Sequence, residues 1–252
     1  MSSLFERMGY KTGRALMKGK CLVDAIMGTQ EEAREAERIL GYHMAEELLR
    51  TLLPLEENEQ LAAVAASGDR LAGRLTDKQF AFQFRAVQAG APNAFALPGG
   101  HVFVNAALLA LCEGHPDELA FVLAHEIAHV VNGHVVDRVV TDSLLTTLVR
   151  TLGPRNAVGT WLGKVGTRAL TSAYSRANED EADLFAVRLS RAAGFTPAAG
   201  ADLMLKLEAL KSRGEQSGLG EYFSSHPPLK ERALVIRRAA RDEAERGRKR
   251  QR

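Results

Sequence analysis

The stretch VLAHEIAHVVNGH, residues 122–134, constrains this chain more than any other segment. Its composition predicts a helix with an apolar surface, yet His125, Glu126 and His129 lie within it. Polar side chains in apolar surroundings are destabilising unless they have partners, and buried charges are paired or bind metals. The fold of this chain must therefore supply a partner for these three side chains, and a cation is the simplest one.

The spacing of the two histidines indicates a metal site. His125 and His129 are four residues apart, so a helix places both rings on one face, one turn from each other. Two imidazoles placed in this way bind one zinc ion, and the adjacent Glu126 reaches the open position of the metal. Zinc lowers the pKa of bound water to about 7, so that Glu126 can take the proton. The alternative is a pair of core histidines that are satisfied by protein neighbours.

Zinc in a catalytic site needs a third protein ligand. A third histidine six residues after His129 is excluded, because a valine stands there. His134 falls one residue short and on the opposite face of the helix from the first histidine, so we interpret it as a structural or surface residue. The helix predicted over residues 174–193 offers Glu179 and Asp183, four residues apart on one face. A solvated acidic helix face is the alternative explanation.

Together these motifs resemble family forty-eight of the metallopeptidases, the group of HtpX, the CAAX prenyl endopeptidases and BepA. That family pairs H-E-x-x-H with a downstream E-x-x-A-D, which Glu179, Ala182 and Asp183 match. The resemblance implies that Glu179 is the third zinc ligand beside the two histidines. It also implies that Asp183 orients a ligand histidine, a usual device at zinc sites.

A second stretch, PNAFALPGGHVFVN at residues 92–105, is similar to the family's strand beside the active site. The backbone of an extended peptide pairs with such a strand. The resemblance therefore implies that substrate is bound by four consecutive residues, Asn93, Ala94, Phe95 and Ala96. A hairpin closed by the Pro-Gly-Gly turn is a structural interpretation of the same segment, and both can hold.

A third stretch, HPPLKERA at residues 226–233, resembles the family's C-terminal H-P motif with a later arginine. The resemblance implies that His226 approaches the zinc site. There it either stabilises the oxyanion of the reaction or occupies the open zinc position as an inhibitory ligand. Arg232 is expected to pair with a carboxylate and hold the site together. On the residues alone, His226 is equally well a turn residue at the start of a helix.

The order of the predicted elements indicates an α+β fold. Helices are expected at 30–53 and 56–75, followed by strands at 79–87 and 101–105, and helices predominate in the remainder. The segment 136–172 has a helical composition, and we expect it either to limit access to the cleft or to form a simple structural hairpin. With the resemblance, the fold expected is a mainly helical, zincin-like metalloprotease domain of the gluzincin type, with a small β-sheet beside the active-site cleft.

One domain is expected over the whole chain. Its expected parts are N-terminal helices over 1–77, a catalytic core over 78–240, which the resemblance covers, and a disordered basic tail over 241–252. The two cysteines do not make a Cys-based zinc site. A net charge of +2 gives no basis for a nucleic-acid partner.

No uncharged apolar run reaches the roughly 18–20 residues that span a membrane. We therefore expect a soluble protein, with a membrane surface as an alternative contact of the basic tail. The location expected is cytoplasmic for the sequence as it stands, and periplasmic or membrane-associated if a signal segment has been removed.

The function expected is that of a zinc-dependent metalloendopeptidase, which hydrolyses peptide bonds in proteins or peptides. Glu126 is the general base on zinc-bound water, His226 is the second catalytic candidate, and a role in protein quality control is part of the hypothesis. Two other classes stay open. One is a zinc-binding holdase that recognises unfolded segments without turnover, and the other is a metal-dependent hydrolase of non-peptide amides. Zinc-dependent cleavage of a protein substrate distinguishes the metalloendopeptidase from both alternatives.

Overall fold

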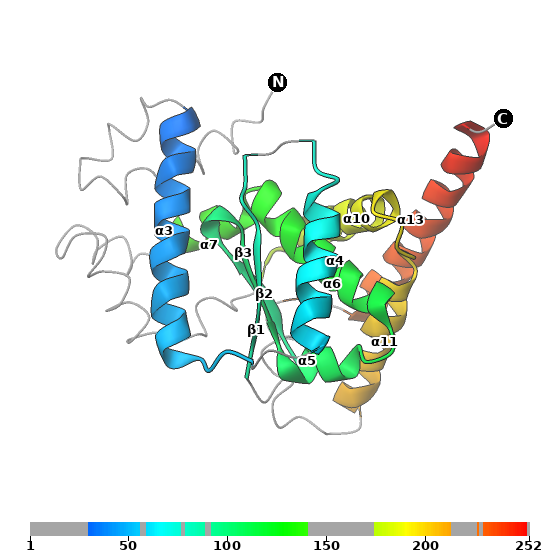
Figure 1. Cartoon of the computed structure of the whole chain (residues 1–252). Helices are drawn as coiled ribbons and strands as arrows, with labels where there is room; N and C mark the ends of the chain where they lie inside the picture. The colour runs from blue at the N-terminus through cyan, green and yellow to red at the C-terminus, as the bar shows by residue number, and fades with distance from the viewer. Residues whose placement is uncertain are drawn as a thin grey trace.

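The computed structural model describes residues 30–55, 59–76, 79–88, 92–140, 174–212, 226 and 229–250. Figure 1 shows a small sheet seen on edge, with α3 (Gln30–Thr51) on one side and the other large helices on the opposite side. This agrees with the mainly helical α+β architecture expected. No helix in these ranges is long and apolar enough to cross a membrane. Most of the predicted 136–172 segment lies outside the described residues.

The sheet contains three strands in the order β1-β3-β2. Strand β1 (Gln83–Val87) runs parallel to β3 (His101–Asn105), and β2 (Ala94–Leu97) runs antiparallel to it. The turn between β2 and β3 is the short helix η1 (Pro98–Gly100). Gly99 and Gly100 have φ angles of 76° and 95°, which glycine adopts without steric penalty. The Pro-Gly-Gly hairpin expected from the sequence is present.

The strand predicted over 79–87 is too long at its N-terminal end. Strand β1 starts at Gln83, because its partner β3 starts at His101, directly opposite. Residues 79–82 precede this register and have no place in the ladder. The alternating pattern of residues 79–82 indicated an extended backbone. Because β3 offers these residues no partner, β1 is shorter than predicted.

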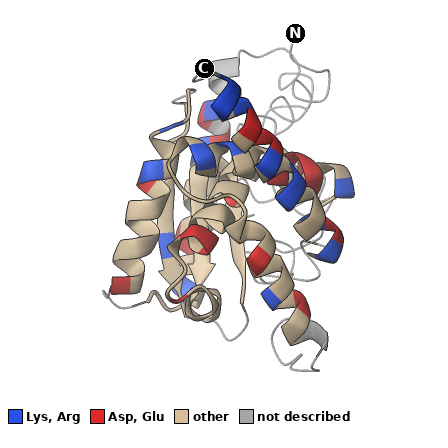
Figure 2. Cartoon of the chain, turned by 90° about the vertical axis from the view of Figure 1, so that its right-hand side faces the viewer, with Lys and Arg blue, Asp and Glu red and all other residues tan. Residues whose placement is uncertain are grey.

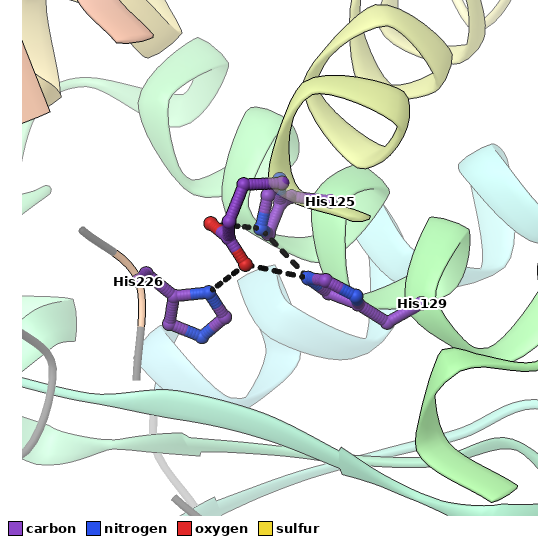
Figure 3. Close-up of side chains that lie close together, drawn as sticks. His125, His129 and His226 are labelled. Carbon is purple, nitrogen blue, oxygen red and sulfur yellow. Dashed lines mark hydrogen bonds and ion pairs between the residues drawn. The ribbon is translucent and has the colours of Figure 1, made fainter. Parts of the chain in front are cut away.

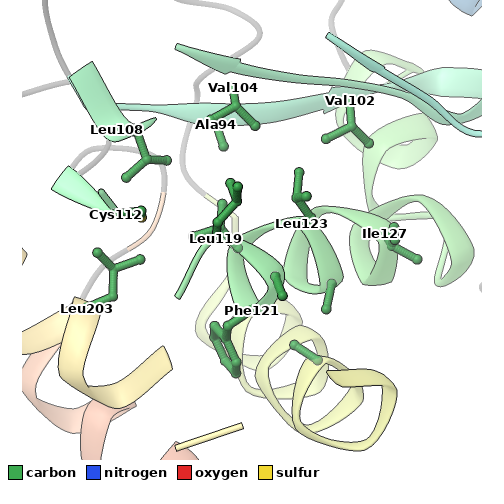
Figure 4. Packing of buried hydrophobic residues seen from close by; sticks show 14 of the residues in the cluster. Ala94, Val102, Val104, Leu108, Cys112, Leu119, Phe121, Leu123, Ile127 and Leu203 are labelled. Carbon is green, nitrogen blue, oxygen red and sulfur yellow. The ribbon is translucent and has the colours of Figure 1, made fainter. Parts of the chain in front are cut away.

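Helices cover both faces of the sheet. Along β3 the side chains alternate between faces, and Val102 and Val104 join the main hydrophobic core against α6 (Pro116–Val131), as Figure 4 shows. On the opposite face α3 approaches so closely that a Cβ at Gly41 would lie 1.7 Å from the carbonyl oxygen of Pro98. Every residue of β3 is consequently buried.

Helix α6 lies at the centre of the helical layer. It packs on β2 and β3, and also on α4 (Glu59–Ala72), α10 (Arg176–Ala192) and α11 (Ala199–Ser212). All its residues from Glu118 to Val130 are buried. His125, Glu126 and His129 are therefore shielded from bulk water by the elements that pack around α6.

The C-terminal tail differs from the expectation. Disorder was predicted over 241–252, but helix α13 (Leu229–Arg250) continues through the described part of that range. Figure 2 shows charged residues of both signs along this helix. Glu243 lies 3.1 Å from Arg246 on the same helix and 3.7 Å from Arg188 of α10. Opposite charges one turn apart, such as those of Glu243 and Arg246, stabilise a helix. The basic composition of the tail did not by itself indicate these ion pairs.

Helix α3 holds the hairpin turn through a buried carboxyl group. Glu37 is 3% exposed, and its Oε1 accepts a hydrogen bond from the backbone N–H of Gly99 at 3.1 Å. Burial raises the pKa of Glu37 from 4.5 to about 7, although Gly99 and Arg34 oppose this shift. The folded state thus holds the proton more tightly than the unfolded state, so stability is lost as pH rises from about 4.5 to 7.

We expect Glu37→Gln to remove this loss, because glutamine keeps an oxygen acceptor for Gly99 but does not ionise. The free energy of unfolding at pH 8 should rise by up to roughly 3 kcal/mol, at about 1.4 kcal/mol per pKa unit, and the gain should shrink towards pH 5. Urea denaturation at both pH values measures it. Glu35→Gln, at an exposed position on the same helix, is the control. An equal gain at both pH values would contradict the assignment.

Candidate metal centre

Four side chains from three separate segments of the sequence converge in one buried cluster. His125 and His129 come from α6, Glu179 from α10, and His226 from just before α13 (Figure 3). Each offers one ligand atom, and these atoms all lie within 4.8 Å of one another. All four are at most 3% exposed. The structure therefore brings together the three predicted metal ligands and the histidine of the H-P motif.

The spacing of the ligand atoms fits a metal ion. Nε2 of His125 lies 3.0 Å from Nε2 of His129, and the latter lies 3.3 Å from Oε1 of Glu179. In a tetrahedral zinc site with bonds of 2.0–2.1 Å, neighbouring ligand atoms are about 3.3 Å apart. Histidine nitrogen and carboxylate oxygen are also ligands that zinc prefers. The donor set thus fits zinc in both chemistry and spacing.

The charge of the cluster also favours a cation. Three carboxylates, those of Glu126, Glu179 and Asp183, are at most 1% exposed, and Arg232 is the one cation beside them in the described residues. With neutral imidazoles, two negative charges are in excess, and a divalent ion balances them. Without a metal, burial and Arg232 act to lower the pKa of His125, but the hydrogen bonds that its ring donates to Asp183 and Glu179 outweigh them and raise it to about 9, so a bound cation would take the place of a proton on this ring.

Arg232 links the helices that carry the ligands. Its Nε and Nη2 donate to the two oxygens of Asp183 at 2.8 and 2.7 Å. Its Nη1 lies 2.9 Å from Oε2 of Glu179 and donates to the carbonyl of His226 at 3.3 Å. Burial acts to raise the pKa of Glu179, but His226 and Arg232 hold it well below its usual range. The guanidinium of Arg232 therefore fixes the carboxylates of Asp183 and Glu179 and the backbone of His226.

Each of the two ligand histidines has a partner on its far nitrogen. Nδ1 of His125 lies 3.0 Å from Oδ1 of Asp183, the position expected for a residue that orients a ligand. Nδ1 of His129 lies 3.0 Å from Nδ1 of His134. Such partners fix the ring orientation and direct Nε2 towards the metal.

The position of His134 corrects the sequence interpretation. A continuous helix would place it on the opposite face from His125, but α6 ends at Val131, and Gly133 with φ of 78° reverses the chain. His134 begins helix α7 (His134–Val140), is 6% exposed and is therefore not a surface residue. Its Nε2 lies 3.5 Å from Oε2 of Glu181, whose side chain is 63% exposed. The sequence shows the five-residue spacing of His129 and His134, but it does not show the turn that brings the two rings together.

Glu126 lies beside the cluster, as its position next to a ligand requires. Its Oε1 is 3.7 Å from Nε2 of His226. Its Oε2 is buried and has no hydrogen-bond partner among the described residues. Nδ1 of His226 lies 2.9 Å from Oε1 of Glu179, so this ring is located among the ligands themselves.

Sequence reasoning missed Tyr174, which precedes Ser175, the N-cap residue of α10. Its ring stacks on that of His129, with centroids 3.8 Å apart and planes inclined by 12°. The guanidinium of Arg138 lies 4.3 Å from the centre of the same ring. Burial holds the pKa of Tyr174 well above its usual range, so the hydroxyl stays protonated. No motif marked this residue, because only the fold places it against a ligand.

Three of the residues predicted to bind substrate, Ala94, Phe95 and Ala96, lie on β2, the strand at one edge of the sheet, and Asn93 immediately precedes it. The backbone N–H of Asn105 donates to the carbonyl of Asn93 at 3.0 Å. Because antiparallel pairing alternates, the backbone groups of Ala94 and Ala96 face away from β3. No strand of the described residues pairs with that edge. Arg138 donates to the carbonyl of Ala96 there, at 3.3 Å.

The side chains of this segment differ in their surroundings. Phe95 stacks on Phe103, with centroids 5.2 Å apart, and is 8% exposed. It is therefore a core residue, and its backbone is what a ligand can reach. The side-chain oxygen of Asn93 is buried without a hydrogen-bond partner among the described residues.

We expect Arg232→Met to lower the free energy of unfolding by about 3–5 kcal/mol, because it leaves buried carboxylates without their counter-ion. Arg237→Met on the same helix is the matched control. Arg237 is 48% exposed and pairs with Asp202 at 2.8 Å, a surface pair worth at most about 1 kcal/mol. Urea denaturation of the metal-free proteins measures both. Equal losses in the two variants would contradict the central role of Arg232.

His134→Leu should weaken zinc binding about 10- to 100-fold, the usual effect of removing the partner of a ligand histidine. His134→Asn should restore much of the affinity, because its side-chain oxygen can accept from Nδ1 of His129. Competition with a chromogenic chelator gives the dissociation constants. Wild-type affinity in His134→Leu would show that His129 is held by other contacts.

The chain was compared with known proteins. Residues 55–240 match Peptidase family M48, so the match begins earlier than the resemblance at 78–240 and includes α4. The mitochondrial metalloendopeptidase OMA1 of Schizosaccharomyces pombe is 32% identical over 159 residues, which is 62% of this chain and 45% of that protein. The metalloprotease LoiP of Escherichia coli is 28% identical over 247 residues, 89% of this chain and 95% of that protein.

A third relative is similar over a smaller part. The Protease HtpX homolog of Albidiferax ferrireducens is 28% identical over 192 residues, 60% of this chain and 63% of that protein. The chain thus spans less than half of the OMA1 protein, under two thirds of the HtpX homolog and nearly all of LoiP. The family match covers well over half of the chain and includes every residue of the buried cluster. The chain belongs to Peptidase family M48.

Proposed function

We propose that this protein is a zinc-dependent metalloendopeptidase that hydrolyses peptide bonds in proteins or peptides. The observation that carries the proposal is the buried cluster of His125, His129 and Glu179, with the carboxylate of Glu126 beside it. Two relatives bear the names metalloendopeptidase and metalloprotease, which supports the same activity here.

His125, His129 and Glu179 would hold the metal. When bound, zinc acts as a Lewis acid on the scissile carbonyl and activates the attacking water. Glu126 has a buried carboxylate oxygen with no partner among the described residues, so it can accept a proton. As the water oxygen bonds to the carbonyl carbon, the π electrons of the carbonyl move to its oxygen and Glu126 takes the proton. Glu126 then gives this proton to the nitrogen as the C–N bond breaks, which leaves a carboxylic acid and an amine.

Substrate binding is proposed at the free edge of β2. Ala94 and Ala96 direct their backbone groups to this edge, where the carbonyl of Ala96 already accepts from Arg138, and an extended peptide can add to the sheet by pairing with the other groups. The unpartnered side-chain oxygen of Asn93 is suited to accept a backbone N–H of the same peptide. Helix α6 packs directly on β2, so a peptide on this edge lies next to the helix that carries Glu126.

His226 is proposed to act as a fourth, inhibitory ligand. Its ring lies among the ligand atoms and 2.9 Å from Glu179, which supports this role over stabilisation of the oxyanion. Catalytic zinc sites keep one position open, whereas closed sites with four protein ligands are structural. Turnover therefore requires His226 to leave the cluster, and a resting protein with His226 in place is latent.

Recognition through backbone atoms suits unfolded or misfolded chains, which expose extended segments of any sequence. A role in protein quality control is therefore part of the proposal, as is the protein or peptide nature of the substrate. A holdase that uses the same edge without turnover is the second candidate, favoured by the same free edge of β2.

Glu126→Gln should keep zinc and lower the rate of casein cleavage by about 10²–10⁴-fold, because it removes the general base. Glu179→Ala should lose zinc as well as activity. Asp180→Ala, a change at the neighbouring carboxylate of α10, is the matched control and should retain both. Metal analysis and cleavage with and without a chelator measure these outcomes.

His226→Ala tests latency in the same experiment, and we expect it to cleave faster than the wild type. Zinc retained in Glu179→Ala would remove Glu179 from the ligand set. A zinc-loaded protein that cleaves nothing, either as wild type or as His226→Ala, would favour the holdase.

A further inference from the structure

One buried polar group in the site has no task in the chemistry described so far. We propose that Tyr174 is a further catalytic residue, whose hydroxyl donates a hydrogen bond to the oxygen of the scissile carbonyl as negative charge develops there. This inference rests on the proposed peptidase function. It assigns the oxyanion to a residue that no motif of the sequence marked.

The ring of Tyr174 is held in place by the site itself. His129 stacks on it, with centroids 3.8 Å apart, and the guanidinium of Arg138 lies 4.3 Å from its centre. The ring of His226 lies 5.7 Å away. Contacts with His129 and Arg138 hold the ring and keep its hydroxyl in a defined position. Preorganised catalysis requires such a fixed donor.

The hydroxyl of Tyr174 is buried, and it has no hydrogen-bond partner among the described residues. A buried donor without a partner destabilises the folded state, so such a group calls for an explanation, and a ligand that supplies the acceptor is one. The ring that carries it stacks on His129 and lies 5.7 Å from the ring of His226, which places Tyr174 beside the metal site.

Two other side-chain donors beside the ligands are already occupied. Arg232 is bound to Asp183 and Glu179, and His226 lies against Glu179. Two buried atoms beside the ligands that have no hydrogen-bond partner among the described residues have complementary chemistry. Oε2 of Glu126 is an acceptor and suits the proton of the water, whereas the hydroxyl of Tyr174 is a donor and suits the developing oxyanion.

The contribution of Tyr174 requires no proton transfer. When the water oxygen bonds to the carbonyl carbon, the π electrons of the carbonyl become a lone pair on its oxygen. The O–H of Tyr174 then donates to that oxygen, and the proton stays on the tyrosine. The hydrogen bond is stronger to the charged oxygen than to the neutral carbonyl, so the effect belongs to kcat and not to KM.

Tyr174→Phe tests the inference, because it keeps the ring that stacks on His129 and removes only the hydroxyl. We expect kcat for a peptide substrate to fall about 100-fold, the effect of removing one oxyanion donor, with KM and zinc content unchanged. A phosphinic peptide, whose tetrahedral oxygens imitate the oxyanion, should bind more weakly to the variant by a similar factor. Tyr42→Phe, at an exposed tyrosine of α3, is the matched control.

The melting temperature of the metal-free protein provides an independent readout. Because the hydroxyl has no partner among the residues that the structure describes, its removal should leave this temperature unchanged or raise it. A lower melting temperature would show that the hydroxyl has a structural partner, and an unchanged kcat would show that it does not meet the oxyanion. Either result overturns the inference while leaving the proposed function intact. Absence of cleavage by both the wild type and His226→Ala would overturn the two together.

Discussion

The buried guanidinium of Arg232 is the interaction on which the rest of the site depends. It is 2% exposed and satisfies Asp183 with two hydrogen bonds and Glu179 with an ion pair. Asp183 in turn holds Nδ1 of His125. Helix α13 is thereby tied to α10 and through it to α6. Breaking such a pair leaves a buried charge without compensation, so ligand geometry and global stability depend on the same side chain.

The remaining organisation follows from the burial of α6. The sheet lies on one side of this helix and α4, α10 and α11 lie on the others, so its two histidines are removed from water. The Nδ1 atom of each ring has a buried partner in place of water, Asp183 for His125 and His134 for His129. Low exposure also strengthens each electrostatic contact. Many polar groups of the site that the structure describes are thus satisfied by one another.

The exceptions to this satisfaction are informative. Oε2 of Glu126, the hydroxyl of Tyr174 and the side-chain oxygen of Asn93 are buried without hydrogen-bond partners in the described part of the chain. Together with the free edge of β2, they are the places where a peptide and a water molecule would supply the missing partners. Under the proposed function, these unsatisfied groups make the site preorganised for the reaction rather than for its own stability.

The local chemistry of the site could be predicted from residue spacing. A four-residue spacing on a helix fixes which side chains share a face, so His125 and His129 could be paired without a structure, and the family motif added Glu179. Contacts that depend on turns and partner strands could not be predicted in this way. The reversal at Gly133 brought His134 to His129, the start of β3 shortened β1, and packing placed Tyr174 on a ligand ring. Periodicity describes a single element, whereas these contacts arise between elements whose relative placement is set by the packing of the whole core.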